Sequence, residues 1–368
     1  MRDPLAEWLL ATVLEWSQED VARERPILQA MAAYKYDEYQ QFSPGMRFVE
    51  SLALWLSQFT TVSERNIAYE FVKKKLVFRS VAEMNHLVGM AYPDYIRPIL
   101  IKKAAAAAGL EGWQVARVAE SLEFKQLQRS CLFLGLSDGA RIDVFRRFNG
   151  RDLTHEQVYP TYEISVGRTE VLVDKLRTSL AQLSVTEAAT AKFTTVVLID
   201  DFSASGVSYL RKEIDGYDGK IGKFFGYVGD TKNEISKLID IHETEFCVLL
   251  YMATGQAISH LEEHLRDLAK TVGVSCSIVV VEPLRPELKL KPGQREPMEQ
   301  LIDLYYDDSI EDEHTKKGGS NLKYGFANSG LPLVLGHNTP NNSLALLWAE
   351  TSKVRALFPR VTRHKKEL

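Results

Sequence analysis

The sequence contains few cysteines and shows no excess of positive or negative charge. Only three cysteines, Cys131, Cys247 and Cys276, occur among its 368 residues, and each lies in an apolar run. This small, odd number is typical of buried thiols in a reducing cytosol and argues against a disulfide-stabilised fold. The formal net charge of −4 gives no general attraction for nucleic acid or anionic lipid, so a nucleic-acid partner would need a local basic patch.

Long apolar segments are also missing. No stretch approaches the ~18 uncharged apolar residues that a membrane span requires. The acidic residues Asp3, Glu7 and Glu15 interrupt the apolar N-terminus, which therefore does not resemble a signal peptide. With 22 glycines and 13 prolines, the chain is not of low complexity. We expect a cytoplasmic globular protein without a membrane partner.

The first third of the chain has a helical pattern. Leu5, Leu9, Val13 and Trp16 recur at the spacing of one helix face. Because 368 residues exceed the ~100–200 of a typical domain, two domains are expected. We predict an all-helical domain over residues 1–120, serving for partner binding or as a lid, followed by a second domain over residues 121–368.

From residue 130 onward, short apolar runs of strand length alternate with helix-period segments. The predicted strands are residues 131–136, 195–199, 246–252 and 277–281, and the predicted helices include residues 168–183 and 256–268. This pattern predicts an α/β fold with a mainly parallel sheet and flanking helices, whose ligands bind at the carboxyl ends of the strands. Residues 216–245 are expected to be an insertion, and the C-terminal region to be irregular.

The strongest local signal is the segment VVLIDDFSASGVSYLR at residues 196–211. It predicts a buried strand, two adjacent carboxylates (Asp200 and Asp201), a turn of small residues and the start of a helix. Amides and hydroxyl groups in such a turn bind phosphate. The carboxylates can accept hydrogen bonds from sugar hydroxyl groups directly, or they can bind these groups through a divalent cation. The predicted phosphate-binding residues are Ser203, Ala204, Ser205, Gly206, Val207 and Ser208. The segment therefore predicts a sugar-phosphate site.

Two other interpretations of this segment stay open. An apolar strand that ends in two aspartates also occurs in phosphoacceptor receiver domains, although these place the pair near their start and lack the small-residue turn. The serines can also simply cap the following helix. We favour the sugar-phosphate interpretation.

The segment resembles the signature of type I phosphoribosyltransferases, in which apolar residues and two acids precede a small-residue loop. The resemblance implies a phosphoribosyltransferase-type sheet in which Asp200 and Asp201 are catalytic and hold the ribose hydroxyl groups of phosphoribosyl pyrophosphate. It also implies Mg²⁺ as a cofactor, held through Asp200 and Asp201, and a 5′-phosphate held by residues 203–208. Two departures are the bulky Phe202 and the polar Ser203.

The region from residue 130 to the end, together with its helical extension, looks like the phosphoribosyltransferase-type effectors of bacterial conflict and phage-defence systems. This resemblance implies a toxic glycosyltransferase activity. It also implies that the helical N-terminal half binds a partner protein or nucleic acid.

A second loop follows the first predicted strand. If the fold is of the phosphoribosyltransferase type, this loop meets the pyrophosphate, and its ligand-binding residues are Ser137, Asp138, Gly139 and Arg141. Arg141 can pair with pyrophosphate oxygens, while Gly139 lets backbone amides approach. The alternative is an ordinary Asp-Gly turn with a solvated arginine.

The C-terminal segment contains the turn HNTPNN after an apolar strand. Its donors and acceptors can read a base or another acceptor, with His337, Asn338 and Asn341 as candidates. The alternative is structural capping of the next helix. His260 and His264, spaced as i and i+4, are expected on a solvated helix face, since no metalloprotease motif surrounds them.

Two functions follow from these observations. The first is a Mg²⁺-dependent phosphoribosyltransferase, or a hydrolase of the same ligand. The second is a non-catalytic module that senses phosphoribosyl pyrophosphate or a nucleotide and signals to a partner through the helical half.

Overall fold

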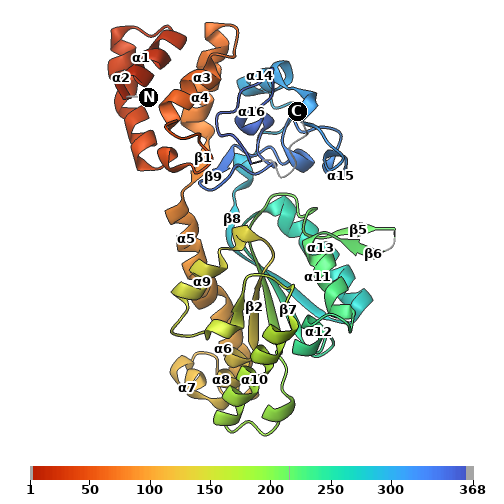
Figure 1. Cartoon of the computed structure of the whole chain (residues 1–368). Coiled ribbons are helices and arrows are strands. Elements are labelled where there is room, and N and C mark those ends of the chain that lie inside the picture. Colours follow the sequence, from red (N-terminus) through yellow and green to blue (C-terminus); the bar gives the residue numbers. More distant parts are fainter. Residues whose placement is uncertain (1–2, 215, 362–368) are drawn as a thin grey trace. The chain divides into compact units, whose positions relative to one another are not determined.

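The computed structural model describes residues 3–214 and 216–361, and the chain forms two compact units (Figure 1). One unit combines the two ends of the chain, Met1–Met84 and Arg285–Leu368, and the other is the middle segment Asn85–Leu284. This division differs from the boundary expected near residue 120. Helices after Met84 pack with the sheet, while the C-terminal third joins the N-terminal helices. Periodicity in a sequence identifies a helix but not the element against which it packs.

The middle unit is built on a five-stranded, wholly parallel sheet with the order β3-β2-β4-β7-β8. The strands are β2 (Cys131–Gly135), β3 (Val158–Tyr159), β4 (Thr195–Ser203), β7 (Glu245–Thr254) and β8 (Ser275–Leu284). Four of them confirm the strands predicted from the sequence, and the short β3 is additional. In the register, Gly135 lies opposite Ile199, which lies opposite Leu249. The carboxyl ends of these three strands therefore meet at one edge.

Helices cover both faces of this sheet (Figure 1). One face packs against α10 (Val166–Gln182), α11 (Lys220–Gly229), α12 (Ile235–Leu238) and α13 (Gly255–Val272). On the other face Phe133 contacts Tyr92 and Phe145, which come from the π-helical turn Ala91–Ile96 and from α9 (Ile142–Phe148). The remaining helices of this part of the chain are α5 (Val81–Met90), α6 (Arg97–Ala107), α7 (Val115–Glu120) and α8 (Leu122–Arg129). Burial on both faces explains why the central strands β2, β4 and β7 are continuously apolar.

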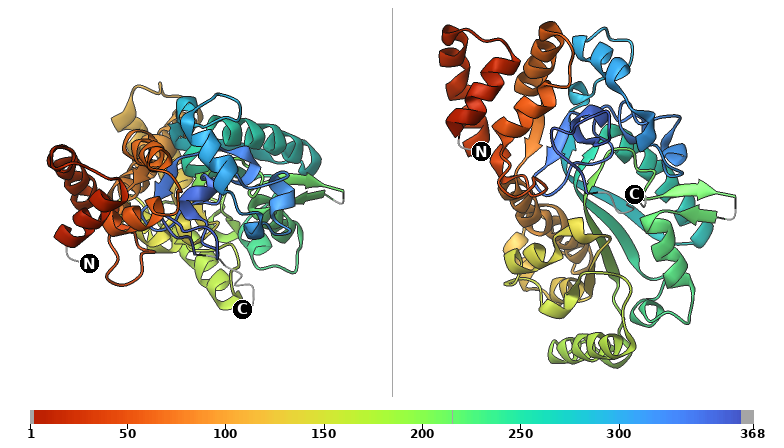
Figure 2. Two further views of the ribbon diagram at one scale, coloured as in Figure 1. Left: turned by 90° about the horizontal axis from the view of Figure 1, so that it is seen from above. Right: turned by 45° about the horizontal axis from the view of Figure 1, so that its top comes forward.

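The segment predicted as an insertion, residues 216–245, contributes to the core of this unit. Helix α11 buries Ile221, Phe224, Phe225 and Val228, which recur at the spacing of one helix face. It follows a hairpin of β5 (Arg211–Glu213) and β6 (Gly216–Asp218), which projects outward in both views of Figure 2. The hairpin is peripheral, whereas α11 is part of the helical layer.

The unit formed by the chain ends is mainly helical. Its helices are α1 (Asp3–Val13), α2 (Gln18–Tyr34), α3 (Phe48–Leu56), α4 (Val62–Lys75), α14 (Pro297–Tyr305), α15 (Thr315–Gly318) and α16 (Ala345–Trp348). Strand β1 (Val77–Arg79) pairs in parallel with β9 (Leu333–Leu335), so this unit is not all-helical. Phe358 is fully buried and stacks on Phe42 and Phe48. The C-terminal region thus completes the fold of the N-terminal helices.

Two further expectations concern thiols and membranes. Among the described residues, no helix is long and apolar enough to cross a bilayer. All three cysteines are free; Cys131 and Cys247 are buried and Cys276 is half-buried. Burial raises the pKa of Cys131 to about 12 and that of Cys247 to about 11, so both thiols stay protonated at neutral pH.

Candidate functional site

The candidate site lies at the carboxyl edge of the central strands. Numbered in chain order, the sheet strands have the spatial order 2-1-3-4-5, so the direction of winding reverses between β2 and β4. In sheets of this order, ligands bind at that reversal. The loop after β2 and the acidic end of β4 both lie there.

Asp200 is fully buried at this edge. Its Oδ1 accepts hydrogen bonds from the Ser137 hydroxyl at 2.5 Å and from the Asp201 amide at 3.1 Å. Its Oδ2 pairs with the Lys220 ammonium group. Burial raises the pKa of Asp200, an effect that Lys220 opposes and Asp201 reinforces. The contact between Ser137 and Asp200 joins the two loops predicted from the sequence.

Asp201 is half-buried and lies against the loop after β2. Its Oδ1 accepts a hydrogen bond from the Phe202 amide at 2.8 Å. A β-carbon on Gly139 would lie only 2.5 Å from Asp201 Oδ2, so a larger residue at position 139 would force the Asp201 carboxylate to shift. The structure therefore brings Gly139 and the acidic pair together.

The helix predicted directly after the small-residue turn is wrong. Residues 204–210 form a turn that leads into β5. Gly206 has φ +79°, and its carbonyl accepts hydrogen bonds from the amides of Tyr209 (2.9 Å) and Leu210 (3.0 Å). The Tyr209 hydroxyl donates back to the Phe202 carbonyl at 2.8 Å. The left-handed glycine and this returning hydrogen bond close the chain on itself before a helix can propagate.

Most of the predicted phosphate-binding residues lie inside this turn, since residues 203–206 are all buried. The Ser203 hydroxyl accepts a hydrogen bond from the Gly206 amide at 3.2 Å, and the Ala204 carbonyl accepts one from the Thr254 hydroxyl at 2.5 Å. Val207 is half-buried and Ser208 is exposed. Neither of their amides donates a hydrogen bond to any residue that the structure describes. The part of the loop open to solvent is therefore 207–208.

Lys220 is a site residue that the sequence analysis missed. Its amide donates to the Ser208 carbonyl at 3.2 Å, and the Ile221 amide donates to the Tyr209 carbonyl at 2.8 Å. Gly219 has φ +96°, and a β-carbon there would lie 2.6 Å from the Tyr209 carbonyl oxygen. The Lys220 ammonium lies 4.7 Å from the centre of the Tyr209 ring. A glycine followed by lysine is the only local signal, and it does not identify the acidic partner.

His260 packs against the turn from α13, contrary to the solvated position expected for it. A β-carbon on Gly206 would lie 2.6 Å from His260 Cδ2. His260 Nε2 lies 2.8 Å from the Leu210 carbonyl oxygen, and the ring stacks on His264 with centres 4.0 Å apart. Burial lowers the pKa of His260. The sequence shows the i, i+4 spacing of His260 and His264, but it does not indicate that His260 packs against the turn at residues 204–210.

The loop after β2 holds the other two predicted pyrophosphate residues. Asp138 is exposed, whereas Arg141 is half-buried and has a left-handed φ of +47°, a strained conformation for a residue with a side chain. Arg141 Nη1 lies 3.3 Å from Asn85 Oδ1. Tyr251 of β7 is fully buried and donates its hydroxyl to the Ala140 carbonyl at 2.7 Å. This hydrogen bond fixes the loop after β2 to strand β7. The apolar sequence of β7 did not indicate this role for Tyr251.

The three predicted residues of the C-terminal turn belong to the other unit. The His337 carbonyl accepts a hydrogen bond from the Gln41 side chain at 2.8 Å, and Asn338 Oδ1 accepts one from a backbone amide at 3.2 Å. The Asn341 carbonyl also accepts a backbone amide, at 2.8 Å. These contacts hold the C-terminal segment within its own unit. Those of His337 and Asn341 are made by backbone carbonyls, so recognition of a base by their side chains stays a prediction.

The residues of the site do not fit a magnesium ion held directly by Asp200. Both of its oxygens are already engaged, Oδ1 by the Ser137 hydroxyl and the Asp201 amide and Oδ2 by Lys220, whose ammonium group supplies a positive charge. The described part of the chain also contains no group of three or more His, Cys, Asp or Glu side chains that could hold a metal ion. The positive charge that the structure places at the acidic pair is the ammonium group of Lys220.

The model of the family described as PRTase-CE matches residues 52–360, well over half of the chain. The match begins within α3 and extends over both units. No curated protein and no solved structure matches.

Proposed function

The chain belongs to the PRTase-CE family, the conflict-effector type of phosphoribosyltransferase, and from this premise we propose that its β4 site binds phosphoribosyl pyrophosphate or a related nucleotide or sugar phosphate. The protein then acts as a phosphoribosyltransferase or as a hydrolase of the same ligand. We assign it to a bacterial antiphage conflict system, in which the N-terminal helices bind a partner protein.

One observation carries this proposal. The acidic pair and the left-handed turn that follows it lie at the reversal point of a doubly wound sheet, and the Ser137 loop contacts the pair directly. Carboxylates accept hydrogen bonds from sugar hydroxyl groups, and backbone amides in a tight turn bind phosphate. The open amides at 207–208 are the donors available to a 5′-phosphate.

The proposed reaction breaks the bond between the anomeric carbon and a pyrophosphate oxygen. The electron pair of that bond leaves with pyrophosphate. An acceptor atom or water forms the new bond to the same carbon and releases its proton to solvent. The acidic pair would position the ribose while the loop at 137–141 faces the leaving group, so the protein contributes mainly by orientation. Neither the acidic pair nor the loop at 137–141 needs to form a covalent intermediate for this reaction.

Labelled phosphoribosyl pyrophosphate tests this function. The protein is incubated with the labelled compound and a pool of bases, nucleotides and RNA, and the label is followed into products. We expect the double variant Asp200→Asn, Asp201→Asn to lose turnover while keeping a cooperative melting transition. The exposed Asp267→Asn variant on α13 is the matched control and should behave as wild type. Full turnover in the double variant would refute the assignment.

Dependence on Mg²⁺ is proposed from the resemblance alone, and no step above uses the ion. Adding EDTA to the same assay tests it. Loss of turnover that is restored by Mg²⁺ supports the dependence, and unchanged turnover rejects it.

A sensing module is the second candidate. It is favoured by the ion pair that already neutralises Asp200 and by the burial of residues 203–206, both of which restrict access to the acidic pair. Binding of phosphoribosyl pyrophosphate in a calorimeter, with no product after long incubation, would support sensing over catalysis.

A further inference from the structure

We propose that Lys220 is a ligand-binding residue that serves as the internal counter-cation of Asp200 until a 5′-phosphate arrives. In the ligand-free protein the ammonium group pairs with Asp200. In the bound state it pairs with the 5′-phosphate, and Asp200 accepts a ribose hydroxyl in its place. This inference rests on the proposed function.

The surroundings of Asp200 identify Lys220 as the partner that moves. Asp200 is fully buried, and its oxygens hold three donors: a short hydroxyl from Ser137, the adjacent backbone amide, and the Lys220 ammonium. The amide is part of strand β4 and cannot leave. Lys220 has a flexible four-carbon side chain that is 30% exposed, so it can withdraw without any backbone movement.

The backbone of Lys220 is fixed beside the phosphate-type turn. Its amide is bonded to the Ser208 carbonyl, and Gly219 allows the chain to pass close to Tyr209. The side chain therefore starts next to the open amides at 207–208. The face of the Tyr209 ring, 4.7 Å from the ammonium, supports the positive charge along this path.

The electrostatic consequence is an exchange of partners. A sugar phosphate brings an anion for Lys220 and hydroxyl groups for Asp200, so the half-buried ammonium and the buried carboxylate both keep a partner throughout. A neutral sugar brings only hydroxyl groups, and its binding would leave the ammonium without an anion. The arrangement thus selects ligands that carry a phosphate on the pentose.

Ribose 5-phosphate and phosphoribosyl pyrophosphate are the probes for the test, with affinity measured by calorimetry on the full chain. We choose Lys220→Gln, whose amide still donates a hydrogen bond but carries no charge, and Lys223→Gln, an exposed lysine on the same helix, as its control. The expected result is at least a tenfold loss of affinity for both probes in Lys220→Gln and less than a twofold change in the control. Lys220→Met should show the same loss if Lys220→Gln does not fold.

The outcomes separate this inference from the function on which it rests. If wild type binds both probes and Lys220→Gln binds them equally well, the inference is overturned and the function stands. A loss confined to phosphoribosyl pyrophosphate would place the ammonium on the diphosphate and would overturn the assignment to the 5′-phosphate. If wild type binds neither probe, both the function and the role of Lys220 fail.

Discussion

The ring of His260 occupies the space that a side chain on Gly206 would need. A β-carbon at position 206 would lie 2.6 Å from His260 Cδ2, and His260 Nε2 lies 2.8 Å from the Leu210 carbonyl oxygen. One imidazole therefore contacts the turn at Gly206 and at its last residue, Leu210. The conformation of the turn depends on this contact as well as on the left-handed φ of the glycine.

Gly206→Ala should disturb this turn by strain and by collision. A side chain in the left-handed region costs ~1–2 kcal/mol, which for a unit of this size lowers the melting temperature by about 2–8 °C. We also expect weaker binding of ribose 5-phosphate. In the double variant Gly206→Ala, His260→Ala the collision is absent, so the part of the stability loss that the collision causes should be recovered. The part caused by backbone strain should remain. Gly226→Ala in α11, where a β-carbon meets nothing within 4 Å, is the control and should not lower the melting temperature. A Gly206→Ala protein as stable as wild type would contradict the geometry.

His260 should make stability depend on pH in the mildly acidic range. Burial holds the pKa of folded His260 below 6.5, so the unfolded chain binds a proton first as the pH falls. The stabilisation that neutral His260 contributes is therefore fully present above pH 6.5 and declines as the pH falls through 6.5. Below the folded pKa of His260 this contribution declines no further. Urea unfolding between pH 7.5 and 5 measures the slope. His260→Gln should flatten it, whereas the exposed His155→Gln should not; equal slopes in all three proteins would exclude this origin.

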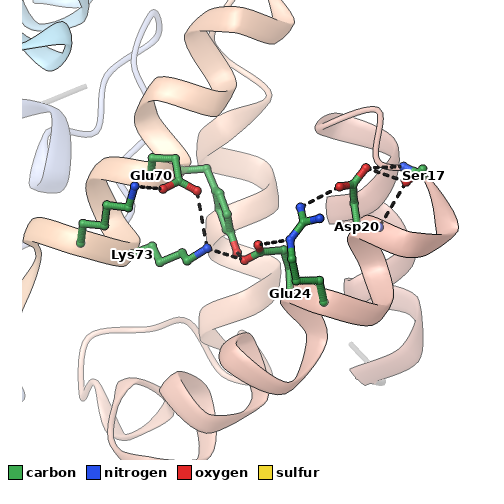
Figure 3. Close-up of polar contacts among 8 residues, drawn as sticks. Ser17, Asp20, Glu24, Glu70 and Lys73 are labelled. Atoms are coloured by element: carbon green, nitrogen blue, oxygen red, sulfur yellow. Dashed lines mark hydrogen bonds and ion pairs between the residues drawn. The ribbon is translucent and has the colours of Figure 1, made fainter.

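Glu24 should give the opposite dependence in the other unit. Its carboxylate, only 4% exposed, accepts hydrogen bonds from Tyr69 (2.7 Å), Lys73 (2.8 Å) and Arg23 (3.1 Å) (Figure 3). Burial opposes ionisation, but these hydrogen bonds outweigh it and lower the pKa of Glu24 below 4.5. Its stabilisation is present above pH 4.5 and is lost as the pH falls through the folded pKa.

Glu24→Gln tests this network. At pH 7 the variant should be less stable by about 1–3 kcal/mol, because Lys73 loses a largely buried ionised partner. The difference from wild type should shrink at a pH below the folded pKa of Glu24, where the wild-type carboxyl group has taken up a proton and both side chains are neutral. Urea denaturation at the two pH values measures it. A difference that stays constant between them would show that the charge of Glu24 is not the cause.

Phe358→Ala should destabilise the unit formed by the chain ends. The Phe358 ring is fully buried, and its centre lies 5.1 Å from that of Tyr39 and 5.6 Å from that of Phe42. Removing a buried phenylalanine costs ~3–5 kcal/mol. Phe148→Ala, at a ring that is 58% exposed, is the comparison and should cost much less. Thermal unfolding of both variants measures the difference, and equal losses would mean that the C-terminal segment is not part of the core.

Much of the site could be predicted because its signals are local. Asp200, Asp201 and Gly206 follow one another along a single strand and turn, and Ser137 follows the neighbouring strand β2. Parallel pairing of β2 with β4 was enough to bring them together. The helix after the turn could not be predicted correctly, since small and polar residues allow both a helix cap and a closed turn. The hydroxyl of Tyr209, which bonds to the Phe202 carbonyl, decides between them.

The sequence by itself determined the strands, the amphipathic helices and the acidic end of β4, because an element with two buried faces needs a continuous apolar run and a helix with one buried face needs a periodic one. Only the tertiary structure decided that Lys220 pairs with Asp200, that His260 covers Gly206, and that β9 returns to β1. These contacts join residues that are distant in sequence. Their free energy depends on geometry that exists only once the intervening chain has folded, so no local pattern of residues records them.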